Sequence, residues 1–136
     1  MNKVLWVFHV LLSLALGIFG LQKVVMALPD LIAQGMWWIE DFTTLQVRTI
    51  GVLEVLAVAG LNLPYFIKQL PKMMVPASTA FVAVTMVGAF ITHFVRQDPV
   101  PSMVVTAMLC AMAVTLTVKR FEQFREPVVS GAGIAG

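Results

Sequence analysis

Four long apolar runs decide what this chain can fold into. Each is close to the length of about 20 residues that an α-helix needs to cross the hydrocarbon core of a bilayer. Prolines stand in the stretches between the runs, and they indicate helix boundaries there. The runs are 4–28, 45–67, 73–95 and 100–118. They predict an all-α fold, an integral membrane four-helix bundle.

Composition supports a membrane protein over a soluble one. Apolar residues make up 60% of the chain and charged residues only 12%, whereas soluble domains carry about 25% charged residues. Four spans would use most of the 136 residues. We therefore expect a single transmembrane domain over residues 1–126, followed by a disordered tail over 127–136.

The first run superficially resembles a signal peptide, because Lys3 precedes an apolar core. That core is too long for a signal peptide. It ends at "GLQKVVMALPD" and not at a small-residue cleavage site followed by a polar mature domain. We interpret the run as a retained span.

Positive charges predict the orientation. Basic residues beyond the helix ends gather on the side that holds the N-terminus, the middle loop and the C-terminus, and cytoplasmic loops are enriched in such residues. We expect both termini inside, an N-in/C-in topology. The residues are Lys3, Lys68, Lys72, Lys119, Arg120 and Arg125. Membrane topology thus accounts for the net charge of +2, and no nucleic-acid partner is expected.

Cysteine and histidine usage argues against thiol and metal chemistry. Cys110 is the single cysteine, so the chain can form no internal disulfide and has no CxxC pair. We interpret it as a packing residue, with a redox role as the alternative. His9 and His93 lie in different runs near opposite faces of the membrane, so they are not expected to share an ion. No metal site is predicted.

Small and polar residues form stripes along three of the predicted helices. At about 100° per residue, the members of each stripe fall within roughly 80° to 100° of one another. Small and hydroxyl side chains let membrane helices approach closely, so the stripes predict the bundle interface. They comprise His9, Ser13, Gly17, Gly20 and Lys23; Ser78, Thr85, Ala89, Thr92, His93 and Arg96; and Ser102, Thr106, Cys110, Ala113 and Thr117.

Glu54 needs a partner, since it lies near the middle of the second run. A charge there costs about 2.5 to 3.5 kcal/mol on insertion scales. Arg48 lies about 120° away around the helix, so another helix should supply the cation. We predict a buried pair with Lys23. Arg48, His93 and Arg96 could join it, which would form a cationic pocket in the outer half of the bundle, although both arginines could instead reach the interface.

Four segments resemble the DoxX-like family of small four-helix membrane proteins. They are "GLQK", "GMWWIEDF", "RTIGVLEVLAVAGLNLP" and "MVGAFITHFVR", and the similarity extends over nearly the whole chain. The resemblance implies a multi-pass protein of the bacterial cytoplasmic (inner) membrane. The family's namesakes are similar to membrane subunits of a thiosulfate:quinone oxidoreductase, and other relatives are linked to quinone or oxidative-stress responses.

The resemblance also points to particular residues. These are Lys23; Arg48, Gly51 and Glu54 in the "RxxGxxE" pattern; and His93. Gly51 shares a helix face with Glu54, so it could let a helix or a ligand approach the carboxylate. Trp37 and Trp38 are interpreted as an interfacial anchor, with a lid over the pocket as the alternative.

Three function classes follow, and none assigns a catalytic residue or decides whether the chain is an enzyme. The first is a quinone-associated redox subunit that binds quinone non-covalently: Lys23, Arg48 or His93 would contact a carbonyl, and Glu54 would carry protons. A redox protein partner would have to supply the electron carrier. The alternatives are a structural or assembly subunit, and a small-molecule or proton-coupled transporter that would act as a homo-oligomer.

Overall fold

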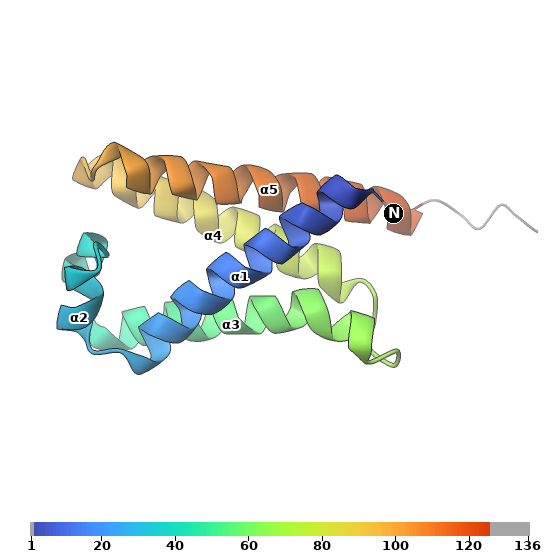
Figure 1. The fold of residues 1–136 in the computed structure, drawn as a ribbon, viewed down its shortest axis with the longest axis horizontal. Helices are drawn as coiled ribbons and strands as arrows, with labels where there is room; N and C mark the ends of the chain where they lie inside the picture. The colour runs from blue at the N-terminus through green and yellow to red at the C-terminus, as the bar shows by residue number, and fades with distance from the viewer. Residues whose placement is uncertain (1, 126–136) are drawn as a thin grey trace, which may run out of the picture.

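The structure is a computed structural model that describes residues 2–125 (Figure 1). Its long helices are α1 (Lys3–Val25), α3 (Thr44–Phe66), α4 (Met74–Arg96) and α5 (Val100–Arg125). Two short elements, α2 (Leu28–Ala33) and the 3-10 helix η1 (Trp37–Asp41), connect α1 to α3. Each of these four helices has the length and the apolar composition needed to span a membrane. The predicted all-α membrane bundle is confirmed, whereas the tail over 127–136 lies outside the described residues.

The long helices form two packed pairs, α1 with α3 and α4 with α5, and α3 also packs against α4. In Figure 1, α1 runs diagonally across the bundle. Its N-terminal end lies close to α5, and its other end lies close to the start of α3. As a result α1 and α5 diverge toward the end of the bundle where α2 lies.

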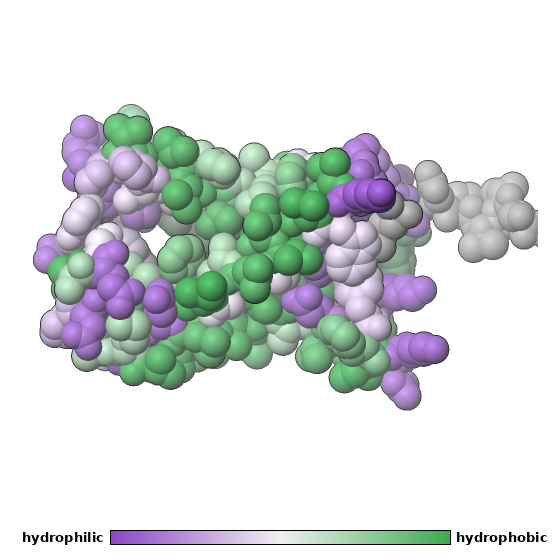
Figure 2. Space-filling view, viewed as in Figure 1, coloured by the Kyte–Doolittle hydropathy of each residue, from purple (hydrophilic) through white to green (hydrophobic). Residues whose placement is uncertain are grey.

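Figure 2 shows a broad apolar belt between two polar ends. On α4, Val84 and Val95 are 72% and 73% exposed, as expected for side chains of a membrane-spanning helix that face lipid. We call the end that carries α2 and η1 the capped end, and α2 with η1 the cap. We call the other end, which carries Lys68, Lys72 and Lys119, the basic end.

The connection between the first two spans is more ordered than the sequence predicted. Helix α1 ends at Val25 and not near Leu28, because Met26 and Ala27 adopt extended backbone (ψ 153° and 146°). Residues 29–44, which separate the first two predicted runs, contain most of α2 and all of η1. Leu31, Ile39 and Val47 form a small core of their own beneath these elements.

One helix end also differs from the prediction, and one proline lies inside a helix. Pro64 lies inside α3, which ends at Phe66, within one residue of the end of the predicted run 45–67; in the last turn a proline removes only one helical hydrogen bond. Helix α5 continues to Arg125 and not to residue 118. Arg120 therefore lies on a helix and is buried, with 8% of its surface exposed.

Candidate functional site

Two glycines bring α1 and α3 into close contact in the capped half of the bundle. A Cβ atom built on Gly51 would lie 2.7 Å from the Lys23 Cβ and 2.8 Å from the Gly20 carbonyl oxygen. A Cβ on Gly20 would in turn lie 3.0 Å from the Cβ of Glu54. Small residues at a crossing allow membrane helices to approach in this way. The group that approaches beside Gly51 is helix α1.

This crossing places Lys23 against Glu54. The Lys23 Nζ lies 2.7 Å from both Oε1 and Oε2 of Glu54, and the side chains are only 7% and 11% exposed. The ion pair predicted from the sequence is present. Arg48 takes no part in it: its guanidinium donates to the Lys23 backbone carbonyl, which belongs to the last turn of α1.

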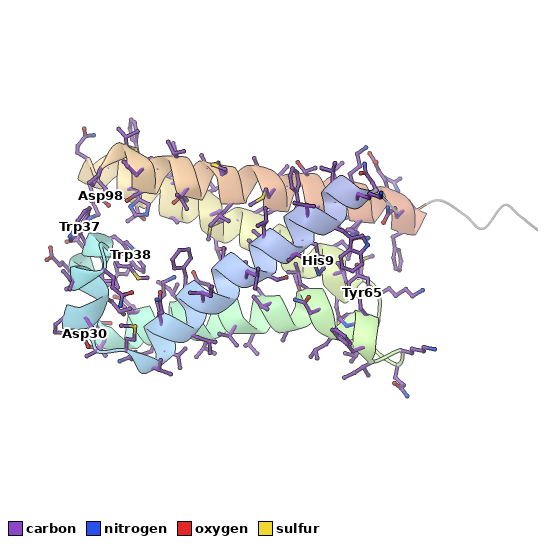
Figure 3. The ribbon with its side chains drawn as sticks, in the orientation of Figure 1. His9, Asp30, Trp37, Trp38, Tyr65 and Asp98 are labelled. Atoms are coloured by element: carbon purple, nitrogen blue, oxygen red, sulfur yellow. The ribbon has the colours of Figure 1, made fainter. Side chains whose placement is uncertain are left out.

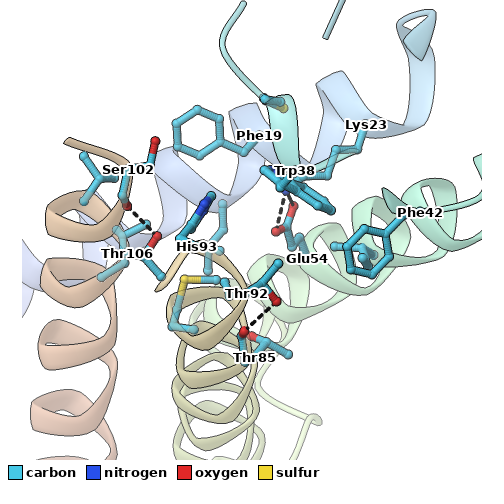
Figure 4. A pocket seen from close by; sticks show the side chains of 18 of the residues that line it. Phe19, Lys23, Trp38, Phe42, Glu54, Thr85, Thr92, His93, Ser102 and Thr106 are labelled. Carbon is cyan, nitrogen blue, oxygen red and sulfur yellow. Dashed lines mark hydrogen bonds and ion pairs between the residues drawn. The ribbon is translucent and has the colours of Figure 1, made fainter. Parts of the chain in front are cut away.

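A cavity of about 580 Å³ lies beside this pair, between the two helix pairs and beneath the cap (Figure 4). Its wall is mainly apolar, with Leu16, Phe19 and Met86 among its members. The polar side chains on the wall are Lys23, Gln34, Glu54, Thr85, Thr92, His93, Ser102 and Thr106. Figure 2 shows that the surface is hollowed between α1, α5 and the cap, where α1 and α5 diverge. Lys23, Glu54 and His93 thus share one cavity, which opens sideways.

His93 lines this cavity from the last turn of α4. Its Nδ1 lies 2.7 Å from Oδ2 of Asp98, and the two side chains are 13% and 9% exposed. Gln97 ends the helix in the left-handed conformation (φ 57°), which turns the chain so that the Asp98 N–H donates to the His93 carbonyl over 3.0 Å. The sequence analysis missed Asp98. Its signal was an acidic residue just past the helix that carries the histidine.

Arg96 does not line the cavity; it ties the cap to the end of α4. Its Nε donates to Asp98 over 3.3 Å, its Nη1 pairs with Asp41, and its Nη2 donates to the Trp37 carbonyl over 3.1 Å. The two adjacent tryptophans, Trp37 and Trp38, differ in position. Trp37 is 42% exposed, whereas Trp38 lines the cavity with its ring centroid 5.6 Å from the Lys23 Nζ.

A second polar cluster near the basic end was only partly anticipated. The His9 Nε2 lies 3.2 Å from the Asn62 Oδ1, and the Asn62 Nδ2 donates to the Ser13 Oγ and to the Val58 carbonyl. The stripe analysis placed His9 and Ser13 at the interface but overlooked Asn62, the polar residue of α3 that faces them. Because a carbonyl only accepts, the bond to Val58 fixes which end of the Asn62 amide is the NH2 group. The amide oxygen therefore faces His9, and His9 must donate from Nε2.

Aromatic rings and Arg120 complete this cluster. The rings of Trp6 and Tyr65 lie 5.2 Å and 5.4 Å from the His9 ring, between centroids, and Figure 3 shows Tyr65 beside His9. The Arg120 guanidinium lies over both aromatic rings, 5.8 Å and 5.9 Å from their centroids. Neither of the two best-defined cavities in the described residues is lined by these side chains, which agrees with a packing role.

Cys110 and the histidines form no metal centre in the part of the chain that the structure describes. Residues 2–125 contain no cluster of three histidine, cysteine or acidic side chains suited to a metal ion. The Sγ of Cys110 is half-buried on α5 and lies 3.8 Å from the Ala83 carbonyl of α4. That contact is the kind a packing residue makes.

Comparison with known proteins gives one family. The model of the DoxX-like family matches residues 7–116, which include α1 to α4, apart from the first turn of α1, and most of α5. No curated protein and no solved structure gives a significant match. The matched segment contains Lys23, Gly51, Glu54 and His93, and the resemblance noted in the sequence is confirmed. This chain, an integral membrane protein with four spanning helices, belongs to the DoxX-like family.

Proposed function

We propose that this protein binds a quinone in the cavity at its capped end and serves as a quinone-associated redox subunit. The observation that carries the proposal is a mainly apolar cavity of about 580 Å³ with a small number of polar side chains on its wall. Small-molecule sites typically have volumes of about 300 to 1,000 Å³ and this kind of lining. A quinone, with its polar ring oxygens and apolar tail, matches both parts.

The position of the opening favours a ligand that arrives through the membrane. The hollow between α1 and α5 lies beside the apolar belt of the surface (Figure 2). Phe19, which is 38% exposed, belongs to both the cavity wall and the outer surface. A membrane-dissolved ligand could therefore keep its tail among the lipid chains while its ring enters.

Electrons would come from a partner protein. The chain has one cysteine and no paired-thiol motif, and two histidines at opposite ends of the bundle provide no shared site. A redox protein that docks on the bundle, or a larger complex with further copies of this chain, would supply the carrier. The Lys23 ammonium would stabilise negative charge on a reduced ring.

For the location we infer the bacterial cytoplasmic membrane, with the basic end inside and the capped end outside. The orientation rests on the lysines of the basic end, because cytoplasmic loops of membrane proteins are enriched in lysine and arginine. These lysines are Lys68, Lys72 and Lys119. A reporter that is active only in the cytoplasm should be active when fused after Arg125 and inactive when inserted at Gly35 in the cap. The reverse pattern would contradict this orientation.

Ligand binding should raise the thermal stability of the purified protein. In detergent, a short-tailed benzoquinone at about ten times its dissociation constant should stabilise the fold by about 1.4 kcal/mol. Ala89→Phe, which adds a ring to the cavity wall, should abolish this shift. Ala107→Phe, on an exposed position of α5 away from that wall, should retain it. Equal shifts in all three proteins would contradict binding in this cavity.

A structural role is the second candidate, because Lys23, Glu54 and Arg96 already have protein partners. Lys23 engages both oxygens of Glu54, and Arg96 joins η1 to α4. Those contacts hold helices together without a ligand. Isolation in a membrane complex that stays intact when Ala89→Phe blocks the cavity would favour this alternative.

A further inference from the structure

We propose that His93, oriented by Asp98, accepts the hydroxyl proton of the ligand's reduced form, and that Glu54 does not. The inference rests on the proposed function, since it concerns a ligand in the same cavity. It assigns the proton-accepting group and makes Asp98 a positioning residue. It also gives the site a preference between two redox states of one molecule.

The hydrogen bond between His93 and Asp98 fixes which ring nitrogen carries hydrogen. An ionised carboxylate only accepts, and Asp98 also receives the Nε–H of Arg96 on its other oxygen, Oδ1. Nδ1 of His93 must therefore be the donor. In the neutral ring Nε2 is then an acceptor with a free lone pair, and it forms no hydrogen bond with any residue from 2 to 125 that the structure describes.

Glu54 is less available to a ligand, although it lines the same cavity. Both of its oxygens lie 2.7 Å from the Lys23 ammonium, so its charge is already matched. The hydroxyls of Thr85 and Thr106 each donate to a carbonyl of their own helix. Among the ionisable side chains on the described wall, His93 is the one with an acceptor that no protein donor occupies (Figure 4).

The proposed step moves one proton. The O–H bond of a hydroquinone hydroxyl breaks, a new N–H bond forms at Nε2, and the electron pair stays on the ligand oxygen as an oxyanion. His93 becomes an imidazolium whose Nδ1–H still points at the Asp98 carboxylate, which stabilises the positive charge. The reverse step returns the proton to the reduced ring.

A preference between redox states follows from this arrangement. A hydroquinone hydroxyl can donate to Nε2, whereas a quinone carbonyl offers only lone pairs and gains nothing from an acceptor. One net hydrogen bond corresponds to roughly a three- to tenfold difference in affinity. The wild type should bind the hydroquinone more tightly by that factor.

Replacing Asp98 with asparagine should invert the preference, because Arg96 determines the orientation of the asparagine amide. In Asp98→Asn the Arg96 Nε–H still requires the amide oxygen, so the NH2 group turns toward His93. Nδ1 must then accept, and Nε2 becomes the donor. The variant should favour the quinone over the hydroquinone. Mere loosening of the loop would weaken both ligands alike.

The test compares a decyl-substituted benzoquinone with the same compound reduced and kept under argon, each titrated by calorimetry in detergent at one fixed pH. The proteins are the wild type, Asp98→Asn, His93→Leu and Thr49→Val; the last is a control at an exposed position of α3 outside the cavity wall, whose hydroxyl donates to the Leu45 carbonyl. Thermal unfolding checks that each variant is folded.

The proposal expects the hydroquinone preference in the wild type and in Thr49→Val, its loss in His93→Leu, and its inversion in Asp98→Asn. Equal affinity of the wild type for both forms would overturn it. So would a preference that survives in His93→Leu. If the wild type binds neither compound, the proposed function itself fails, and that result is distinct from binding without discrimination.

Discussion

Glu54→Gln should destabilise the bundle by about 3 to 5 kcal/mol, the usual cost of removing one partner of a buried ion pair. The variant leaves the Lys23 ammonium without its counter-charge at a site where only 7% of the side chain is exposed. Lys23→Met should lose a similar amount for the mirror-image reason. The double variant should lose much less than the sum, since no uncompensated charge remains.

The measurement is thermal or denaturant unfolding in detergent of the two single variants and the double. A matched control is the exposed pair Lys119 and Glu122, whose charged atoms lie 2.8 Å apart but whose side chains are 53% and 55% exposed; its removal should cost about 0 to 1 kcal/mol. Strictly additive losses at Lys23 and Glu54 would contradict the coupling. If the double variant folds and still gives the quinone-dependent shift, the pair serves folding alone.

Gly51→Ala should cost about 1 to 3 kcal/mol, the usual range for overpacking a tight contact. The direction is informative, because alanine is intrinsically about 1 kcal/mol better than glycine inside a helix. Here the added methyl group would meet the backbone oxygen of Gly20 at 2.8 Å, and backbone cannot rotate away. The helices would have to separate, which would also disturb Lys23.

Gly17→Ala and Gly88→Ala are the matched controls, since a Cβ at either position would have no atom within 4 Å outside its own helix. They should leave the free energy of unfolding unchanged or raise it by up to about 1 kcal/mol. Unfolding curves of the three variants in one detergent decide the matter. If Gly51→Ala behaved like the controls, α1 and α3 would not cross as closely as described.

Much of the fold followed from the sequence, for a physical reason. A bilayer fixes the length of a spanning helix, so the four spans could be located to within a few residues at most ends. The pair of Lys23 and Glu54 could be predicted because a buried carboxylate needs a cation, and few cationic residues of this sequence lie deep enough in a span. Both arguments depend on the free-energy cost of burying a charge in the membrane and on the depth of a residue along its span. Both can be estimated from the sequence.

The rest depended on which loop residues return to the bundle. Asp41 and Arg96 are 55 residues apart in sequence, and nothing local predicts that they meet. Asp98 reaches His93 only because Gln97, a residue without glycine's freedom, takes a left-handed conformation. The cap was not predicted because residues 28–41 show no extended helical periodicity of apolar residues. Its order comes from the three-residue core beneath it.

The sideways opening between α1 and α5 changes how selectivity must be understood. A ligand that enters there leaves one hydrocarbon environment for another and displaces acyl chains, which are as apolar as the leucines on the wall. Its tail therefore contributes little net free energy, and the relevant scale is its mole fraction among lipids, not its molarity in buffer. Two membrane molecules with the same tail would be told apart by their head groups alone, and a change in tail length should leave the ranking intact.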